Sequence, residues 1–192
     1  MIQYNFKISD KLWQIGVIDD RGGPFHRLVL TKGTTYNSYF YTTIRGNTKK
    51  IANYISDKLI ESKRFNVSVF DGDKTSHSQI IDSIEKSDLV LIGSATKYGD
   101  MIGSLENLLK ALPSLEGKTT ASFGSFAWSG EAIEIIGDYL KEKSSTYLTT
   151  SDAIKKTGCL EYEFPIRLRY NLSESNMKKL DSAIKYIESV IN

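Results

Sequence analysis

A short loop at residues 42–48 combines hydroxyl groups, a glycine and the start of a predicted helix. It reads Thr42-Thr43-Ile44-Arg45-Gly46-Asn47-Thr48 and runs directly into an amphipathic segment. Hydroxyls of Thr43 and Thr48 can donate to phosphate oxygens, while Gly46 lets the backbone approach a ligand closely. The free amides at a helix start also favour an anion. A capped turn before an ordinary helix has the same composition, so this loop alone leaves both interpretations open.

Two further loops each place an aromatic residue among small ones, directly after a segment that is expected to be a strand. They read Ser94-Ala95-Thr96-Lys97-Tyr98-Gly99-Asp100 and Ser125-Phe126-Ala127-Trp128-Ser129-Gly130. A planar ligand gains buried area and stacking from aromatic side chains, and backbone amides can satisfy its polar edge. A loop aromatic can also simply cover the core. Together with a phosphate loop, however, the three segments predict a site for a flat heterocycle that carries a phosphate.

From about residue 37 onward, strand-like and helix-like segments alternate. The expected strands are residues 37–41, 66–70, 88–94 and 119–124, with the pieces 146–150 and 164–169 forming the last one. The expected helices lie around residues 51–59, 76–84, 101–112, 130–143 and 173–191, and Ser76 and Ser173 are the expected caps of the second and the last of them. The run Leu89-Val90-Leu91-Ile92 is apolar at every position, as in the middle of a parallel sheet with helices on both faces.

This alternation predicts an α/β fold, a doubly wound parallel sheet of five strands in the flavodoxin-like order 2-1-3-4-5. In such sheets ligands bind outside the carboxyl ends of the strands, where the strand order reverses. The three loops described above follow the first, third and fourth expected strands. They should therefore meet at one site.

Residues 1–36 break the alternation. Residues 12–18 and 25–30 alternate loosely between apolar and polar side chains, and turn-forming residues lie between them. This pattern predicts a β-hairpin or a pair of strands. We therefore expect two parts, an N-terminal β-hairpin segment at residues 1–36 and an α/β domain at residues 37–192.

The composition excludes several classes of protein. Of the residues, 40% are hydrophobic and 25% charged, with a net charge of +2 and no basic stripe, so we expect no nucleic-acid partner. The single Cys159 rules out an internal disulfide and a cysteine-based zinc site. The N-terminus lacks the pattern of a secretory signal, and no apolar stretch approaches the roughly 20 residues that span a bilayer. We expect a cytoplasmic protein without a membrane partner.

Three stretches resemble the flavodoxin domain of the flavodiiron (A-type) flavoproteins: Tyr41–Thr48, Ile92–Thr96 and Phe123–Ala132. The resemblance covers about residues 37–192 and implies FMN as the cofactor. It implies phosphate contacts from Thr43, Ile44, Arg45, Gly46, Asn47 and Thr48. It implies ring contacts from Ser94, Ala95, Thr96, Lys97, Tyr98 and Gly99, and from Ser125, Phe126, Ala127, Trp128, Ser129 and Gly130. Arg45, Ala95 and Lys97 depart from the family, where an aromatic, a proline and an uncharged residue are usual; these departures concern the redox potential and the affinity.

Stretches around residues 16–19, 25–26 and 33–39 resemble the opening strands of the family's metallo-β-lactamase-like diiron domain. The remainder of that domain has no counterpart in the sequence, which contains only two histidines, His26 and His77. A diiron site of the family type needs more imidazoles, so we expect no metal site and no oxygen- or nitric-oxide-reductase activity. Family dimers bring one subunit's flavin close to the other's diiron domain. The resemblance therefore makes a homodimer through residues 1–36 plausible.

These features predict an FMN-binding electron-transfer protein that works with a redox partner protein. The flavin would carry the redox chemistry, so no catalytic side chain is assigned. One alternative is an FMN-dependent NAD(P)H:acceptor oxidoreductase, in which an exposed ring face takes hydride. Another is a flavodoxin-fold interaction module that has lost its flavin.

Overall fold

The computed structural model describes residues 2–9, 12–19, 23–25, 28–30, 34–41 and 46–191. The chain divides into two compact units, Met1–Arg45 and Gly46–Asn192. Among the helices described, none has the length and apolarity that crossing a membrane requires.

The first unit consists of antiparallel β-structure. β2 (Leu12–Asp19) lies between β1 (Ile2–Ser9) and β5 (Thr34–Tyr41), and β3 (Gly23–Phe25) pairs separately with β4 (Leu28–Leu30). The hairpin expected between residues 12–18 and 25–30 is therefore not found. β1 and β5 each offer β2 a ladder along most of its length, whereas β3 and β4 are only three residues long.

Two segments that were expected to be strands of the parallel sheet are not paired in that sheet. Residues 37–41 belong to β5, where they pair antiparallel with β2 and Tyr41 lies opposite Leu12. Residues 66–70 have no regular secondary structure. A strand is held by the ladder to its neighbour, because its backbone groups need partners. The neighbour expected for residues 66–70 was the segment 37–41, so pairing of that segment with β2 accounts for both differences.

The second unit contains a parallel sheet. Its strands are β6 (Leu89–Ala95), β7 (Thr119–Phe126), β8 (Thr146–Tyr147) and β9 (Ile166–Arg169). β7 pairs in parallel with β6, with β8 near its start and with β9 near its end. The prediction of a parallel α/β sheet is confirmed, with four strands in the described residues.

The predicted helices are found, together with one that was not expected. They are α1 (Asn47–Glu61), α2 (His77–Glu85), α3 (Gly103–Ala111), α4 (Glu131–Lys143), α5 (Thr150–Thr157) and α6 (Glu174–Val190). The hydroxyls of Ser76 and Ser173 accept from backbone amides and cap α2 and α6, as the sequence predicts. The additional helix, α5, is capped in the same way by Thr149.

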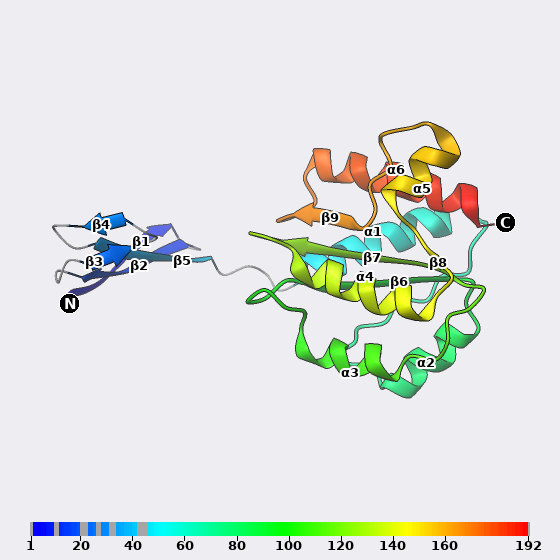
Figure 1. Cartoon of the computed structure of the whole chain (residues 1–192), viewed down its shortest axis with the longest axis horizontal. Helices are drawn as coiled ribbons and strands as arrows, with labels where there is room; N and C mark the ends of the chain where they lie inside the picture. The colour runs from blue at the N-terminus through cyan, green and yellow to red at the C-terminus, as the bar shows by residue number, and fades with distance from the viewer. Residues whose placement is uncertain are drawn as a thin grey trace. The chain divides into compact units, whose positions relative to one another are not determined.

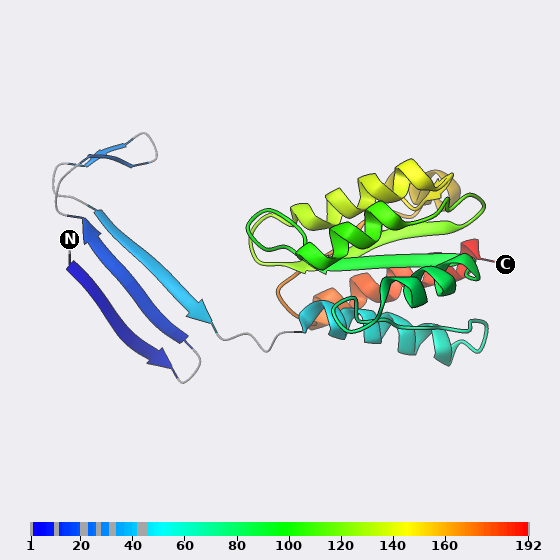
Figure 2. The same ribbon diagram turned by 90° about the horizontal axis from the view of Figure 1, so that it is seen from below.

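Helices cover both faces of this sheet (Figures 1 and 2). On one face, α1 and α6 pack against β7 and β9; on the other, α2, α3 and α4 pack against β6. Along β6, Val90 and Ile92 belong to the hydrophobic core formed with α2, α3 and α4. Leu89 and Leu91 pack against the core formed with α1 and α6. This explains why the strand is apolar at every position, as expected for the interior of a doubly wound sheet.

Candidate functional site

The loops that follow β6 and β7 begin side by side. Ala95 lies opposite Ser125 in the ladder between the two strands. The backbone amide of Thr96 then donates to the carbonyl oxygen of Ser125 at 3.3 Å. The two loops expected to contact a planar ring therefore start from adjacent points at the carboxyl edge of the sheet.

The amino end of α1 reaches the same point. Thr48 Oγ1 lies 3.2 Å from Ser125 Oγ, and the Ser125 side chain is buried. Gly46 precedes the helix with φ 137°, and Asn47 is its first residue. Of the expected phosphate loop, Thr43, Ile44 and Arg45 lie outside the described residues. Thr48 is thus brought next to Ser125 at the end of β7, and Gly46 and Asn47 directly precede it in the chain.

This amino end of α1 has the character of an anion site. Gly46 gives it no side-chain cap, and its first turn contains no acidic residue. Instead the first turn includes Lys49 and Lys50, both exposed. Cations are unfavourable at the positive end of a helix dipole, and the free amides there bind anions well. A phosphate at this position would offset the charge and occupy the amides.

The loop after β6 forms a tight turn. The backbone groups of Lys97 and Asp100 bond to each other in both directions, at 2.8 and 3.1 Å. Tyr98 has φ 56° and Gly99 φ 79°, as in a type I′ turn, whose two central residues both need positive φ. Such a φ is unusual for tyrosine. The turn leaves the Tyr98 side chain 97% exposed, with Lys97 Nζ 5.6 Å from its ring centroid.

Two hydroxyl groups lie at the base of this turn. Ser94 Oγ accepts from the amide of Ile102 at 3.2 Å and donates to the carbonyl of Ala95 at 3.0 Å. Thr96 Oγ1 is buried yet has no hydrogen-bond partner among the described residues. Buried polar groups are nearly always paired. The unpaired hydroxyl of Thr96 therefore suits a polar edge of a ligand.

The loop after β7 presents the second exposed aromatic residue. Ser125 and Phe126 end the strand, Ala127, Trp128 and Ser129 are exposed, and Gly130 precedes α4 with φ 84°. Trp128 is 90% exposed. At this edge of the sheet its indole ring is available for stacking on a planar ligand.

The carboxylate of Glu131 lies at the end of this loop. Ser129 Oγ donates to Glu131 Oε2 at 2.6 Å. This bond holds the pKa of Glu131 below its ordinary value, with smaller contributions from the residue's own backbone amide and from Arg167. Glu131 lies in the first turn of α4, where the helix dipole also favours a negative charge.

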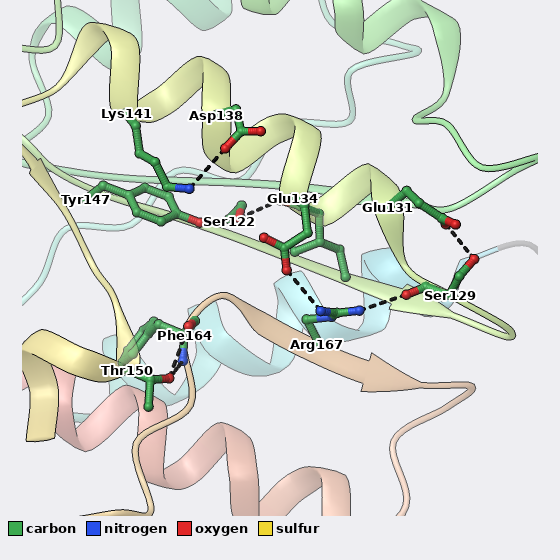
Figure 3. A network of polar contacts seen from close by, with 11 residues as sticks. Ser122, Ser129, Glu131, Glu134, Asp138, Lys141, Tyr147, Thr150, Phe164 and Arg167 are labelled. Atoms are coloured by element: carbon green, nitrogen blue, oxygen red, sulfur yellow. Dashed lines mark hydrogen bonds and ion pairs between the residues drawn. The ribbon is translucent and has the colours of Figure 1, made fainter.

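Sequence reasoning missed two residues that support this loop, Arg167 and Glu134. Arg167 of β9 donates through Nη1 to Glu134 Oε1 at 2.9 Å and through Nη2 to the carbonyl oxygen of Ser129 at 2.7 Å (Figure 3). Its guanidinium lies 5.6 Å from the ring centroid of Phe126. The one available indication was the expected strand at 164–169, whose carboxyl end had to reach the same edge of the sheet as the loop.

The geometry suits a flat ligand with a phosphate better than a metal ion. The free end of α1 and the Thr48 and Thr96 hydroxyls supply hydrogen-bonding groups, while Tyr98 and Trp128 supply aromatic surface. Within residues 46–191 and the described strands of the first unit, no group of three or more histidine, cysteine or acidic side chains could hold a metal ion.

A family model and several curated proteins match part of the chain. The family model described as Flavodoxin matches residues 40–159. Among curated proteins, Type A flavoprotein fprA of Rhodobacter capsulatus is 36% identical over 99 residues, 50% of this chain and 23% of that protein. The chain thus spans less than a quarter of this relative's length.

Solved structures show the same fold. A flavodoxin from the domain Archaea has a TM-score of 0.57 and 26% identity, over 77% of this chain and 93% of its own. Rubredoxin oxygen:oxidoreductase from Desulfovibrio gigas has a TM-score of 0.59 and 19% identity, over 74% of this chain and 32% of its own. The second likeness concerns the fold alone.

Proposed function

The chain belongs to the flavodoxin family, whose members bind FMN, and we propose that it binds one FMN and transfers electrons between redox partner proteins. The observation that carries this proposal is the convergence of three segments on Ser125. Thr48 meets its hydroxyl, and Thr96 bonds to its carbonyl oxygen. The exposed aromatic residues Tyr98 and Trp128 stand in the two loops that start there.

The phosphate of FMN is assigned to residues 43–48. Support comes from the uncapped amino end of α1, from Lys49 and Lys50 in its first turn, and from the Thr48 hydroxyl. A dianionic phosphate accepts several hydrogen bonds at once, and bonds to a charged acceptor are the stronger kind. The sequence-based assignment of Thr43, Ile44 and Arg45 to this group is retained as part of the proposal.

The isoalloxazine ring is assigned to residues 94–99 and 125–130. Tyr98 and Trp128 supply faces on which a ring can stack, and the Thr96 hydroxyl can serve its polar edge. When bound, the isoalloxazine accepts and releases electrons one or two at a time. The residues of this chain bind and orient it and set its surroundings, so no side chain is assigned a catalytic role.

We further propose that the parallel sheet has five strands in the order 2-1-3-4-5. Support comes from β6, which has helices on both faces but pairs with only one described strand, β7. A strand buried on both faces normally has neighbours on both edges.

Residues 1–36 are proposed as a structural segment and a contact surface, through which a homodimer could form in the cytoplasm. The likeness of this segment to the opening of a metallo-β-lactamase-like domain remains a prediction. Light scattering on the full chain tests the homodimer. A mass of two chains across a range of concentrations is expected, and a mass of one chain would contradict it.

An anaerobic reduction experiment tests the proposed function against an FMN-dependent NAD(P)H:acceptor oxidoreductase. The FMN-loaded protein should be reduced by dithionite and should pass its electrons to an added redox protein. It should react slowly with NADH or NADPH, because a carrier receives its electrons from a partner protein. Rapid turnover with a nicotinamide would favour the oxidoreductase. Failure of the folded protein to retain FMN would favour an interaction module.

A further inference from the structure

The carbonyl group of Ser129 is held by a side chain from a different strand. Arg167 of β9 reaches across to it with Nη2 at 2.7 Å and binds Glu134 of α4 with Nη1 at 2.9 Å. Figure 3 shows the guanidinium between these two acceptors. One planar group thus connects β9, α4 and the loop that carries Trp128.

The start of the same loop lies under the same guanidinium. Arg167 Cζ is 5.6 Å from the ring centroid of Phe126, within the range of a cation–aromatic contact. Trp128 therefore stands between two points, Phe126 and Ser129, that Arg167 contacts. The loop leaves little space at its end, since a Cβ at Gly130 would lie 3.1 Å from Phe126 and 3.2 Å from Arg167 Nη2.

Trp128 itself is 90% exposed. A side chain with so little contact of its own depends on its backbone for its position. The two hydrogen bonds donated by Arg167 and its contact with the Phe126 ring hold that backbone in one arrangement. The fork is specific to arginine, because a lysine ammonium is a single point charge that cannot hold two separated acceptors in a plane.

From this geometry we infer that Arg167 is a positioning residue for the flavin site, which sets the place of Trp128 and thereby the affinity for the ring. This inference rests on the proposed FMN function. Arg167 acts by holding the loop backbone. What matters is that its guanidinium binds Glu134 and the Ser129 carbonyl at the same time, and its charge alone is secondary.

Two variants separate the hydrogen bonds of Arg167 from its charge. Arg167→Met removes both, whereas Arg167→Lys keeps the charge and loses the forked pair of bonds. Titration of the full-length apoprotein with FMN, followed by flavin fluorescence, should show about fivefold to tenfold weaker binding for both, consistent with the loss of one charge-assisted bond. Bound flavin should also be less quenched, because its stack on Trp128 is looser. Binding of wild-type strength in Arg167→Lys would overturn the inference, since charge alone would then suffice.

Arg64 offers a matched control. Its guanidinium donates to the backbone carbonyls of Glu188 at 3.0 Å and Ile191 at 3.1 Å, and it lies 5.6 Å from the ring centroid of Phe65. It follows the carboxyl end of α1, whereas Thr48 lies at the amino end. Arg64→Met should change the melting temperature about as much as Arg167→Met while leaving FMN affinity and quenching unchanged. Equal losses of affinity in both variants would reduce Arg167 to a general structural role.

A double-mutant cycle with Trp128→Ala tests whether Arg167 acts through the tryptophan. In the Trp128→Ala background, Arg167→Met should change FMN affinity by less than about twofold, and full additivity would refute the inference. Arg167→Lys keeps the test open if Arg167→Met does not fold. If the folded wild-type protein binds no FMN, the proposed function fails; if it binds FMN and the arginine variants bind equally well, only the inference fails.

Discussion

Thr48 Oγ1 and Ser125 Oγ lie 3.2 Å apart although 77 residues separate them in the chain. The contact joins the amino end of α1 to the carboxyl end of β7. It brings together a segment assigned to the phosphate and a segment assigned to the ring.

Replacing Thr48 with valine keeps the shape of the side chain and removes its hydroxyl. We expect FMN to bind about tenfold more weakly, since one hydrogen bond to a charged acceptor is lost. Riboflavin, which has no phosphate, should bind as before. Isothermal titration with both ligands measures the difference, and Thr157→Val in α5, whose hydroxyl bonds to the carbonyl of Ala153, serves as the control. Equal losses for FMN and riboflavin would refute the phosphate assignment.

Lys97 stands in the turn assigned to the ring, with Nζ 5.6 Å from the Tyr98 ring centroid. A cation near the flavin favours its anionic reduced form, because little water screens the interaction in a partly closed site. Lys97→Met should therefore lower the potential of the couple that forms the fully reduced flavin. Spectroelectrochemistry of both one-electron couples gives the shift, with Lys155→Met in α5 as the control. An unchanged lower couple would show that Lys97 faces solvent.

Gly124 of β7 packs tightly against β6 and α4. A Cβ at this position would overlap the carbonyl oxygen of Ser94 and lie 2.9 Å from Cγ1 of Ile133. Gly124→Ala should lower the free energy of unfolding by roughly 1–3 kcal/mol, the usual effect of overpacking. Gly72→Ala is the matched control, because its Cβ meets no atom within 4 Å, and should stay within about 0.5 kcal/mol of wild type. Urea unfolding measures both variants, and equal free energies of unfolding for the two would contradict the close packing.

The Ser129 hydroxyl lowers the pKa of Glu131. The carboxylate therefore contributes to stability above its ordinary pKa of 4.5, and this contribution is lost as the pH falls through the lowered value of the folded protein. Ser129→Ala should raise the pKa of Glu131 in an NMR titration of side-chain carboxyl carbons. The pKa of Asp152, lowered mainly by Thr149, should not move. An unchanged Glu131 pKa would mean that the hydroxyl does not bond to it in solution.

Local patterns in the sequence predicted most of the second unit. Ile51, Ile55 and Leu59 recur at helical spacing and are all buried in α1, and the capping serines of α2 and α6 were recognisable from their positions. The short helix α5 was not expected, because eight residues provide little periodicity. Patterns of this kind depend on neighbours in the chain, which a sequence shows directly.

Pairing between distant segments was harder to predict. Residues 34–41 have the composition of a strand but do not specify a partner, and they pair with β2 in the structure. β-propensity describes how a segment fits a pleated surface and leaves the choice of neighbour to the rest of the fold. The bond from Arg167 to the Ser129 carbonyl joins residues 38 positions apart. No local pattern predicts such a contact.

Binding of FMN by the folded chain is the central claim, and a calorimetric titration of the full-length apoprotein with FMN tests it most directly. We predict saturation at one FMN per chain, and binding of riboflavin at least about tenfold weaker because the phosphate contacts are missing. Circular dichroism on the same sample establishes that the protein is folded. A folded protein that takes up no FMN, or that binds riboflavin and FMN equally well, would contradict the account.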